Sequence, residues 1–131
     1  MNAAIEFHDS EVSTVEITGD RIRIHFSAAY VHQSAGQPGI DAGSGYTQAV
    51  DVCMSEAALV GSQRESIGSV SDGDLVANGQ SMKNVVPLPF EAIGTIKLNL
   101  QFCNGTLISV EAKSVTIRQV GQARFVEAYK C

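Results

Sequence analysis

The sequence predicts an all-β fold, a single-domain antiparallel β-sandwich or flattened barrel of roughly eight strands that spans residues 1–131. Two segments each read as a β-hairpin whose apolar side chains fall on one face. Short apolar stretches separated by glycine-containing turns make up most of the remainder. Hydrophobic residues are 44% and charged residues 18% of the chain, which is typical of a globular domain.

The segment 95–112 predicts its own strand register. If Cys-Asn-Gly at residues 103–105 forms a three-residue loop, Leu98 faces Val110 and one face of the hairpin is apolar throughout. A two-residue turn would slip the register by one residue and set Leu98 against Glu111, which would bury a charge. We therefore expect the three-residue loop, with its glycine at positive φ.

A second hairpin is predicted near the start of the chain, with its turn at residues 19–20. Glycine comes first in this turn, as the type II′ geometry requires. The resulting register sets Val15 opposite Ile24 on the apolar face and Glu16 opposite Arg23 on the polar face. Because an exposed ion pair contributes about 1 kcal/mol or less, the apolar face must supply most of the stability.

The rest of the chain gives weaker signals. They are a strand at 50–54, a turn at 71–74, a proline-containing edge piece at 85–89, a bulge or sheet crossing at 113–114, and a short final strand at 125–129. A short helix at 55–60 is a further expectation. Two loop-like segments, 33–45 and 61–74, complete the chain.

The 33–45 loop is the expected functional surface. It contains four glycines, which make it costly to order, and a connection of about 13 residues without structure is uncommon unless it is functional or mobile. The rival interpretation is that Pro38 and Ile40 pack the loop over an open end of the core.

Composition excludes several classes of function. Nine basic against 14 acidic residues leave a net charge of −5 without a basic cluster, which disfavours nucleic-acid binding. No apolar stretch is long enough for a transmembrane helix, and residues 1–13 lack a signal-peptide core, so a cytoplasmic protein without membrane association is expected. Phosphate-binding, dinucleotide and nucleophile-elbow motifs are missing, and no cofactor or catalytic set is predicted.

The three histidines are predicted to be poor joint metal ligands. The sequence HDSE begins at His8, but strand alternation would point His8 away from Asp9 and Glu11, so a polar turn explains the cluster. His25 and His32 lie seven residues apart, on opposite faces unless a bulge intervenes. His32 shares the phase of the core side chains and is expected to be a hydrogen-bonded histidine at the end of the core.

The opening IEFHDSEV, followed after six residues by GDRIRIHF, resembles the start of small, poorly characterised bacterial β-proteins, including some immunity proteins of toxin systems. The resemblance covers about the first 30 residues. It implies a bacterial, non-enzymatic protein that acts by binding a partner, and it transfers no catalytic residue.

Two functions are therefore carried forward. The favoured one is a non-catalytic binding or interaction protein, immunity-like in the sense of the resemblance, whose partner is a protein. The oligomeric state is left open, with a homodimer as one option. The alternative is a small-ligand or metal-binding β-protein with a pocket formed by His32, the 33–45 loop and Tyr46. The candidate binding residues are His32, Asp41, Tyr46 and Gln48.

The three cysteines give a local prediction. None is spaced as a C-x-x-C pair, so free thiols are expected. Cys103 begins a tight surface loop, whereas Cys53 lies within a strand. Alkylation of the native protein, followed by peptide mass spectrometry, should label Cys103 and Cys131 well before Cys53. Equal protection of Cys103 and Cys53 would mean that another molecule covers the hairpin tip.

Overall fold

A computed structural model describes residues 1–61 and 67–129. This part of the chain contains no helix, and strands make up 82% of it, so the predicted all-β class is confirmed. The described residues form nine strands: β1 (Asn2–Thr18), β2 (Arg21–Ser34), β3 (Gly43–Ser55), β4 (Ala58–Gly61), β5 (Gly68–Ala77), β6 (Gln80–Lys83), β7 (Val85–Leu88), β8 (Phe90–Phe102) and β9 (Leu107–Tyr129).

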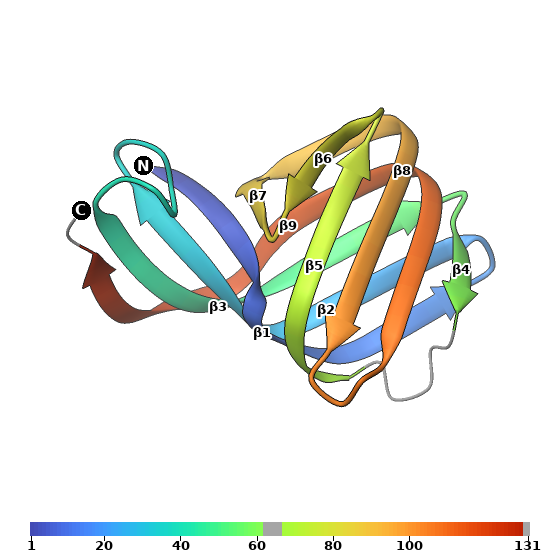
Figure 1. Cartoon of the computed structure of the whole chain (residues 1–131), viewed down its shortest axis with the longest axis horizontal. Coiled ribbons are helices and arrows are strands. Elements are labelled where there is room, and N and C mark those ends of the chain that lie inside the picture. The colour runs from blue at the N-terminus through green and yellow to red at the C-terminus, as the bar shows by residue number, and fades with distance from the viewer. Residues whose placement is uncertain (62–66, 130–131) are drawn as a thin grey trace.

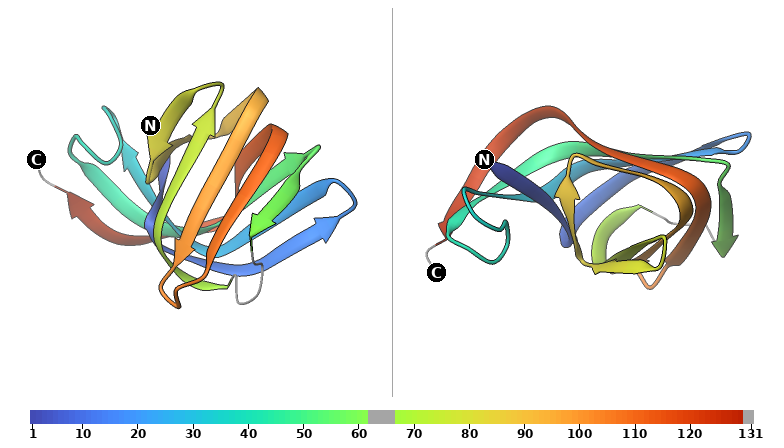
Figure 2. Two further views of the ribbon diagram at one scale, coloured as in Figure 1. Left: turned by 45° about the vertical axis from the view of Figure 1, so that its right-hand side comes forward. Right: turned by 90° about the horizontal axis from the view of Figure 1, so that it is seen from above.

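These strands make one antiparallel sheet in the order β6-β5-β8-β9-β3-β2-β1-β7, with β4 added to β9. The sheet curls until β1 meets β5, where Glu11 pairs with Ser69 and Val12 pairs with Gly68. This closure produces a flattened barrel, which the two views in Figure 2 show from the side and from above.

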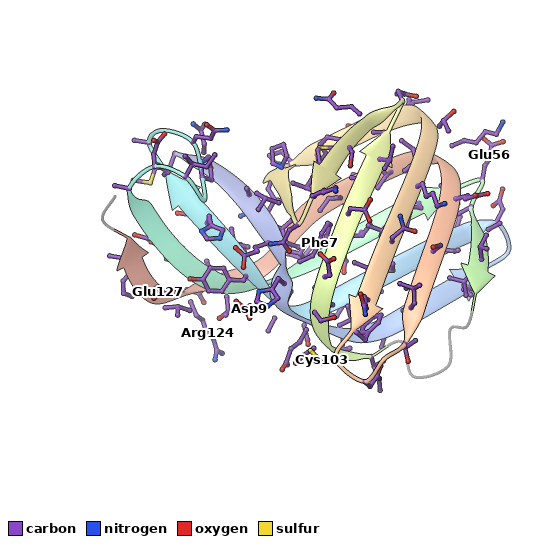
Figure 3. The ribbon with its side chains drawn as sticks, viewed as in Figure 1. Phe7, Asp9, Glu56, Cys103, Arg124 and Glu127 are labelled. Atoms are coloured by element: carbon purple, nitrogen blue, oxygen red, sulfur yellow. The ribbon has the colours of Figure 1, made fainter. Side chains whose placement is uncertain are left out.

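Both predicted hairpins are confirmed in their register. In β1 and β2, Val15 pairs with Ile24 and Glu16 with Arg23. In β8 and β9, Leu98 pairs with Val110, and the loop glycine Gly105 has a φ of 90°. Cys103 is exposed at the tip of this hairpin (Figure 3), whereas Cys53 is half-buried.

The core lies inside the barrel, between two walls of the curled sheet. The rings of Phe7 and Phe26 stack there with their centroids 6.1 Å apart. Other buried members are Ile22, Ile24, Val50, Val52 and Met54 from β2 and β3, and Leu75, Leu98, Leu100, Ile108 and Val110 from β5, β8 and β9.

Four strands extend beyond the barrel and form an arm, seen to the left in Figure 1. The arm consists of residues 2–6 of β1, 30–34 of β2, 43–47 of β3 and 124–129 of β9. Three of these strands change register where the arm begins. Extra residues lie at 7–10 in β1, 27–28 in β2 and 121–123 in β9, and Asp9 and Gly121 have φ values of 72° and 73°. These β-bulges bend the sheet.

The predicted turn at 71–74 is wrong, because these residues lie inside β5. Gly73 is needed there for close packing, not for a turn: a Cβ added to it would lie 2.9 Å from Phe7 Cβ and 2.9 Å from Leu100 Cδ2. A glycine within a strand often marks such a close approach.

The predicted helix at 55–60 is also wrong. β4 lies there instead, and Ala58 pairs with Glu111 of β9. Six residues are too few to stabilise a helix by local interactions, and β9 offers unpaired backbone groups beyond the end of β3.

Other boundaries shift. β2 and β3 extend into the predicted 33–45 loop and leave a loop of residues 35–42. The predicted final strand at 125–129 is the end of the much longer β9. The edge piece is confirmed as β7, and the irregularity near 113 is a register shift with its extra residue in β8, at Gly94. Of the second predicted loop, residues 62–66 lie outside the described residues.

Replacing Gly73 by alanine should lower the free energy of unfolding by about 1–3 kcal/mol, because the new methyl group displaces Phe7 or Leu100. Urea denaturation followed by circular dichroism measures the change. Ser69→Ala, an exposed position on the same strand, is the control and should stay within about 0.5 kcal/mol of the wild type. Equal stability of the two variants would contradict the tight packing at Gly73.

Candidate functional site

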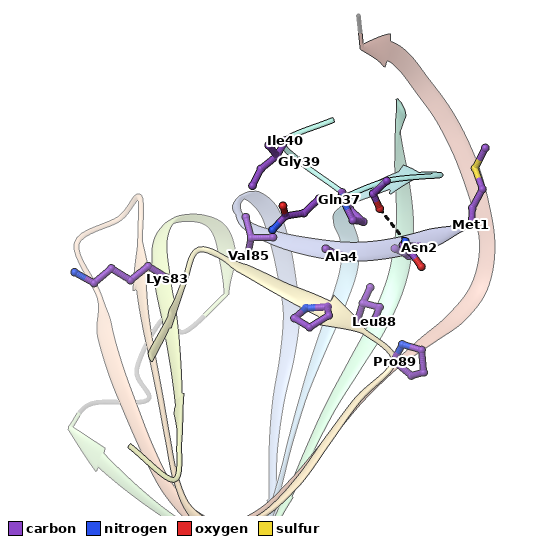
Figure 4. A pocket seen from close by; sticks show the side chains of 14 residues that line it. Met1, Asn2, Ala4, Gln37, Gly39, Ile40, Lys83, Val85, Leu88 and Pro89 are labelled. Atoms are coloured by element: carbon purple, nitrogen blue, oxygen red, sulfur yellow. Dashed lines mark hydrogen bonds between the residues drawn. The ribbon is translucent and has the colours of Figure 1, made fainter. Parts of the chain in front are cut away.

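A cleft of about 960 Å³ lies between the 35–42 loop, the start of β1 and the segment from β7 to Pro89. Figure 4 shows the loop on one side of this cleft and the β7 segment on the other. The lining is mostly aliphatic and proline side chains, including Pro38, Ile40, Pro87, Leu88 and Pro89. Its size falls within the range of small-molecule sites.

The 35–42 loop is held in place by hydrogen bonds. Asn2 Nδ2 donates to the carbonyl oxygen of Gly36 (2.8 Å), and Ser34 Oγ donates to the carbonyl oxygen of Ala42 (2.7 Å). Within the loop, the backbone N–H of Gln37 donates to Asp41 Oδ2 (2.6 Å). The Asp41 carboxylate therefore closes the loop on itself, and Asp41 is not among the residues that line the cleft.

His32 lies under this loop, 7% exposed. Its Nε2 is 2.9 Å from Glu6 Oε1, and a Cβ added to Gly39 would lie 3.8 Å from His32 Cδ2. The expected hydrogen bond is thus present, but the expected face is wrong. The bulge in β2 gives the core position to Val31, which is fully buried, and turns His32 to the same face as His25.

Glu6, His8 and Asp9 are the described residues that could hold a metal ion, because one ligand atom from each lies within 4.8 Å of the others. The prediction that strand alternation points His8 away from Asp9 is wrong. Asp9 has a positive φ, and its carboxylate lies 3.2 Å from His8 Nδ1. Carboxylates and imidazole suit borderline divalent ions. His8 and Asp9 are exposed, and their mutual contact satisfies them without an ion.

Tyr46 and Gln48 are not brought together with His32. Tyr46 pairs with Val31, so it lies on the opposite face of the sheet, where its ring packs edge-on against Phe125 at 5.7 Å. Gln48 Nε2 donates to the carbonyl oxygen of Gly121 (3.0 Å). Tyr46 and Gln48 therefore support the end of β9 rather than the cleft.

An ion-pair network on the outer face of the barrel was not predicted. Asp51, 7% exposed, accepts a hydrogen bond from Arg23 Nη2 (3.0 Å) and lies 2.5 Å from His25 Nδ1. Burial raises the pKa of the Asp51 carboxyl, but hydrogen bonds from His25 and Arg23 outweigh it and hold the pKa below its ordinary value of 3.8. The sequence signal is the cross-strand set of Glu16, Arg23, His25 and Asp51.

This network does not form a hydrolytic triad. Within residues 1–61 and 67–129, no serine or threonine hydroxyl is hydrogen-bonded to the His25 ring. The contacts of Asp51 serve to satisfy a carboxylate that the sheet has buried, because a buried charge is costly unless it is paired.

Searches of family models, curated proteins and solved structures find no match to this chain. The resemblance of the first segment to small bacterial β-proteins therefore stays a prediction. In the part of the chain that the structure describes, no helix has the length and apolar character needed to cross a membrane.

Asp51→Asn should destabilise the protein by roughly 1.5–3 kcal/mol at pH 7, because hydrogen bonds to a charged acceptor are weakened. The pKa of Asp51 is lower in the folded state, so its stabilising effect is complete above pH 3.8 and is lost as the pH falls through the lowered pKa. Denaturant unfolding at several pH values should show the difference between wild type and variant disappear in acid. Asp20→Asn, in the exposed first turn, is the control; a difference that is independent of pH would contradict the assignment.

Proposed function

We propose that this protein is a small non-catalytic binding protein that holds an amphipathic, anionic organic ligand in the cleft between the 35–42 loop and β7. The observation that carries the proposal is the chemistry of the cleft lining. Among the described residues, the lining combines a largely apolar surface with one lysine and no acidic residue, in a chain whose net charge is −5.

The apolar part of the lining sets the character of the ligand body. Ile40 is 62% exposed, and Leu88 is 8% exposed at the base of the cleft. Pro87 and Pro89 flank Leu88 and add rigid apolar surface without backbone N–H groups. A ligand that covers this surface removes apolar area from water, which contributes about 25 cal/mol for each Å².

The polar part of the lining sets the charge of the ligand. Lys83, at the end of β6, is the one lysine or arginine among the lining residues. Asn2 and Gln37 line the same cleft, and both carry amides that can donate hydrogen bonds. An anionic group near Lys83 would meet an attractive charge and no carboxylate among the described lining residues. Asp74 lies opposite Lys83 in the β5–β6 ladder, outside this lining.

The 35–42 loop, which is part of the 33–45 segment expected to be the functional surface, forms one wall of the cleft. His32 supports this wall from below without lining the cleft. The proposal therefore takes the small-ligand alternative for this site, with Ile40 and Lys83 in place of His32, Asp41 and Tyr46 as the ligand-contacting side chains.

Two probes with the same ring system test the proposal. 8-Anilinonaphthalene-1-sulfonate is anionic, and N-phenyl-1-naphthylamine is its uncharged counterpart. Fluorescence titration should show saturable binding of both to the native protein. Ile40→Ser should weaken both probes by about fivefold because apolar contact is lost. Lys83→Gln should weaken only the sulfonate, by roughly two- to fivefold, as expected for an exposed ion pair.

Leu107→Ser is the matched control, because Leu107 is 58% exposed on the hairpin next to Cys103 and does not line the cleft. It should bind both probes as the wild type does. Thermal melts of all variants confirm that the probes report on folded protein. The proposal fails if neither probe saturates, or if Leu107→Ser and Ile40→Ser weaken binding equally.

A further inference from the structure

The arm has two edge strands, β1 and β9, which differ in whether a further strand pairs with them. The β1 edge is covered by β7, which pairs Ile5 with Val86. The β9 edge is open. β8 pairs with β9 only as far as Ile117, and among the described residues the rest of β9 pairs with β3 alone. Figure 1 shows this end of β9 as the outermost strand of the arm.

The open edge carries exposed apolar side chains. Phe125 is 61% exposed and Val126 is 48% exposed, although Phe125 packs on Tyr46 on one side. Residues 118–128 contain no proline, so the backbone groups along this edge remain able to pair. An open edge of this kind is a template for another strand.

The register of β9 against β3 places two opposite charges symmetrically about the Phe125–Val126 bulge. Arg124 pairs with Thr47 and Glu127 pairs with Gly45. Because Val126 is an extra residue in this register, Arg124 and Glu127 point to the same face, as residues two apart normally do. Figure 3 shows both side chains on the outer side of the arm.

We propose that two copies of this chain associate through this edge, with their β9 strands antiparallel about a two-fold axis at the Phe125–Val126 bulge. Arg124 of each copy then lies opposite Glu127 of the other, and the pair forms twice. The two Phe125 side chains meet next to the axis and lose exposed surface. A two-fold interface uses one self-complementary patch in this way.

The charge pattern favours a second copy over an unrelated strand. A foreign peptide would need an acidic and a basic residue at matching positions, whereas a second copy provides them by symmetry. Each copy has a net charge of −5, so overall electrostatics opposes association and the local pairs must offset it. The Tyr30 hydroxyl donates a hydrogen bond to Glu127 Oε1 at 2.6 Å, which orients the Glu127 carboxylate.

This inference does not depend on the proposed ligand. The cleft lies at the β1 edge of the arm, and the association surface lies at the β9 edge. Loss of ligand binding in Ile40→Ser leaves the β9 edge unchanged, and monomeric variants of β9 keep the cleft. The two experiments therefore fail independently.

The test is sedimentation velocity of the purified full chain from low to high micromolar concentration. The wild type should show a reversible monomer–dimer equilibrium. Arg124→Glu should raise the dimer dissociation constant by at least about tenfold, because two like-charge contacts replace two ion pairs. Glu127→Arg should do the same. The double variant Arg124→Glu/Glu127→Arg recreates both pairs in reverse and should restore the dimer.

Lys113→Glu is the net-charge control for Arg124→Glu, since it makes the same charge change at an exposed position of β9 within the barrel. It should dimerise as the wild type does. Circular dichroism melts establish that each variant is folded. A wild type that stays monomeric, a dimer that both single variants retain, or a double variant that stays monomeric while folded would each overturn the proposal.

Discussion

The arrangement of the whole molecule depends on one buried hydroxyl. Ser10 is fully buried; its Oγ donates to the carbonyl oxygen of Glu6 (2.5 Å) and accepts the backbone N–H of Tyr30 (2.9 Å). It thereby replaces ladder bonds that the bulge in β1 removes. The backbone N–H groups of Phe7 and His8 donate to Asn84, so the bulge leaves these donors satisfied, as buried backbone requires. These hydrogen bonds stabilise the part of the bend that lies in β1.

The bend explains how a small chain offers two separate surfaces. Within the barrel, β1, β2, β3 and β9 have one face against the core, and their neighbours complete the closure. Past the bulges the same strands leave the barrel. Toward β7 they still bury Ile5 and Val31, whereas toward β9 Phe125 and Val126 are exposed. One edge of the arm receives β7 and the 35–42 loop and forms the cleft; the other edge, at Arg124 to Glu127, receives nothing from the described residues. Both proposals therefore follow from a change of strand direction.

Local sequence patterns predicted the hairpins, because alternation and turn chemistry act over a few neighbouring residues. They predicted the all-β class and the edge position of β7 for the same reason. They failed where a bulge changes the phase: His32 was assigned to the core face, and Asp9 was directed away from His8. The cleft could not be predicted, since it joins residues 2–4, 36–40 and 83–89, whose proximity depends on topology and not on spacing. The interior glycine of β5 was taken for a turn because its neighbours in space were unknown.

The long strand β9 has unequal support along its length. Its first half is held by hydrogen bonds on both sides, by β8 and by β4 or β3. After Ile117, among the described residues, it is held on one side only, by β3. The end of β9 can therefore separate from β3 without disturbing the barrel, and the free energy of this local opening is smaller than that of global unfolding. Gly121, with its positive φ, lies at the boundary between the two halves. The chain thus contains a cooperative barrel and, at the end of β9, a strand segment whose local stability depends on the strands that pair with it.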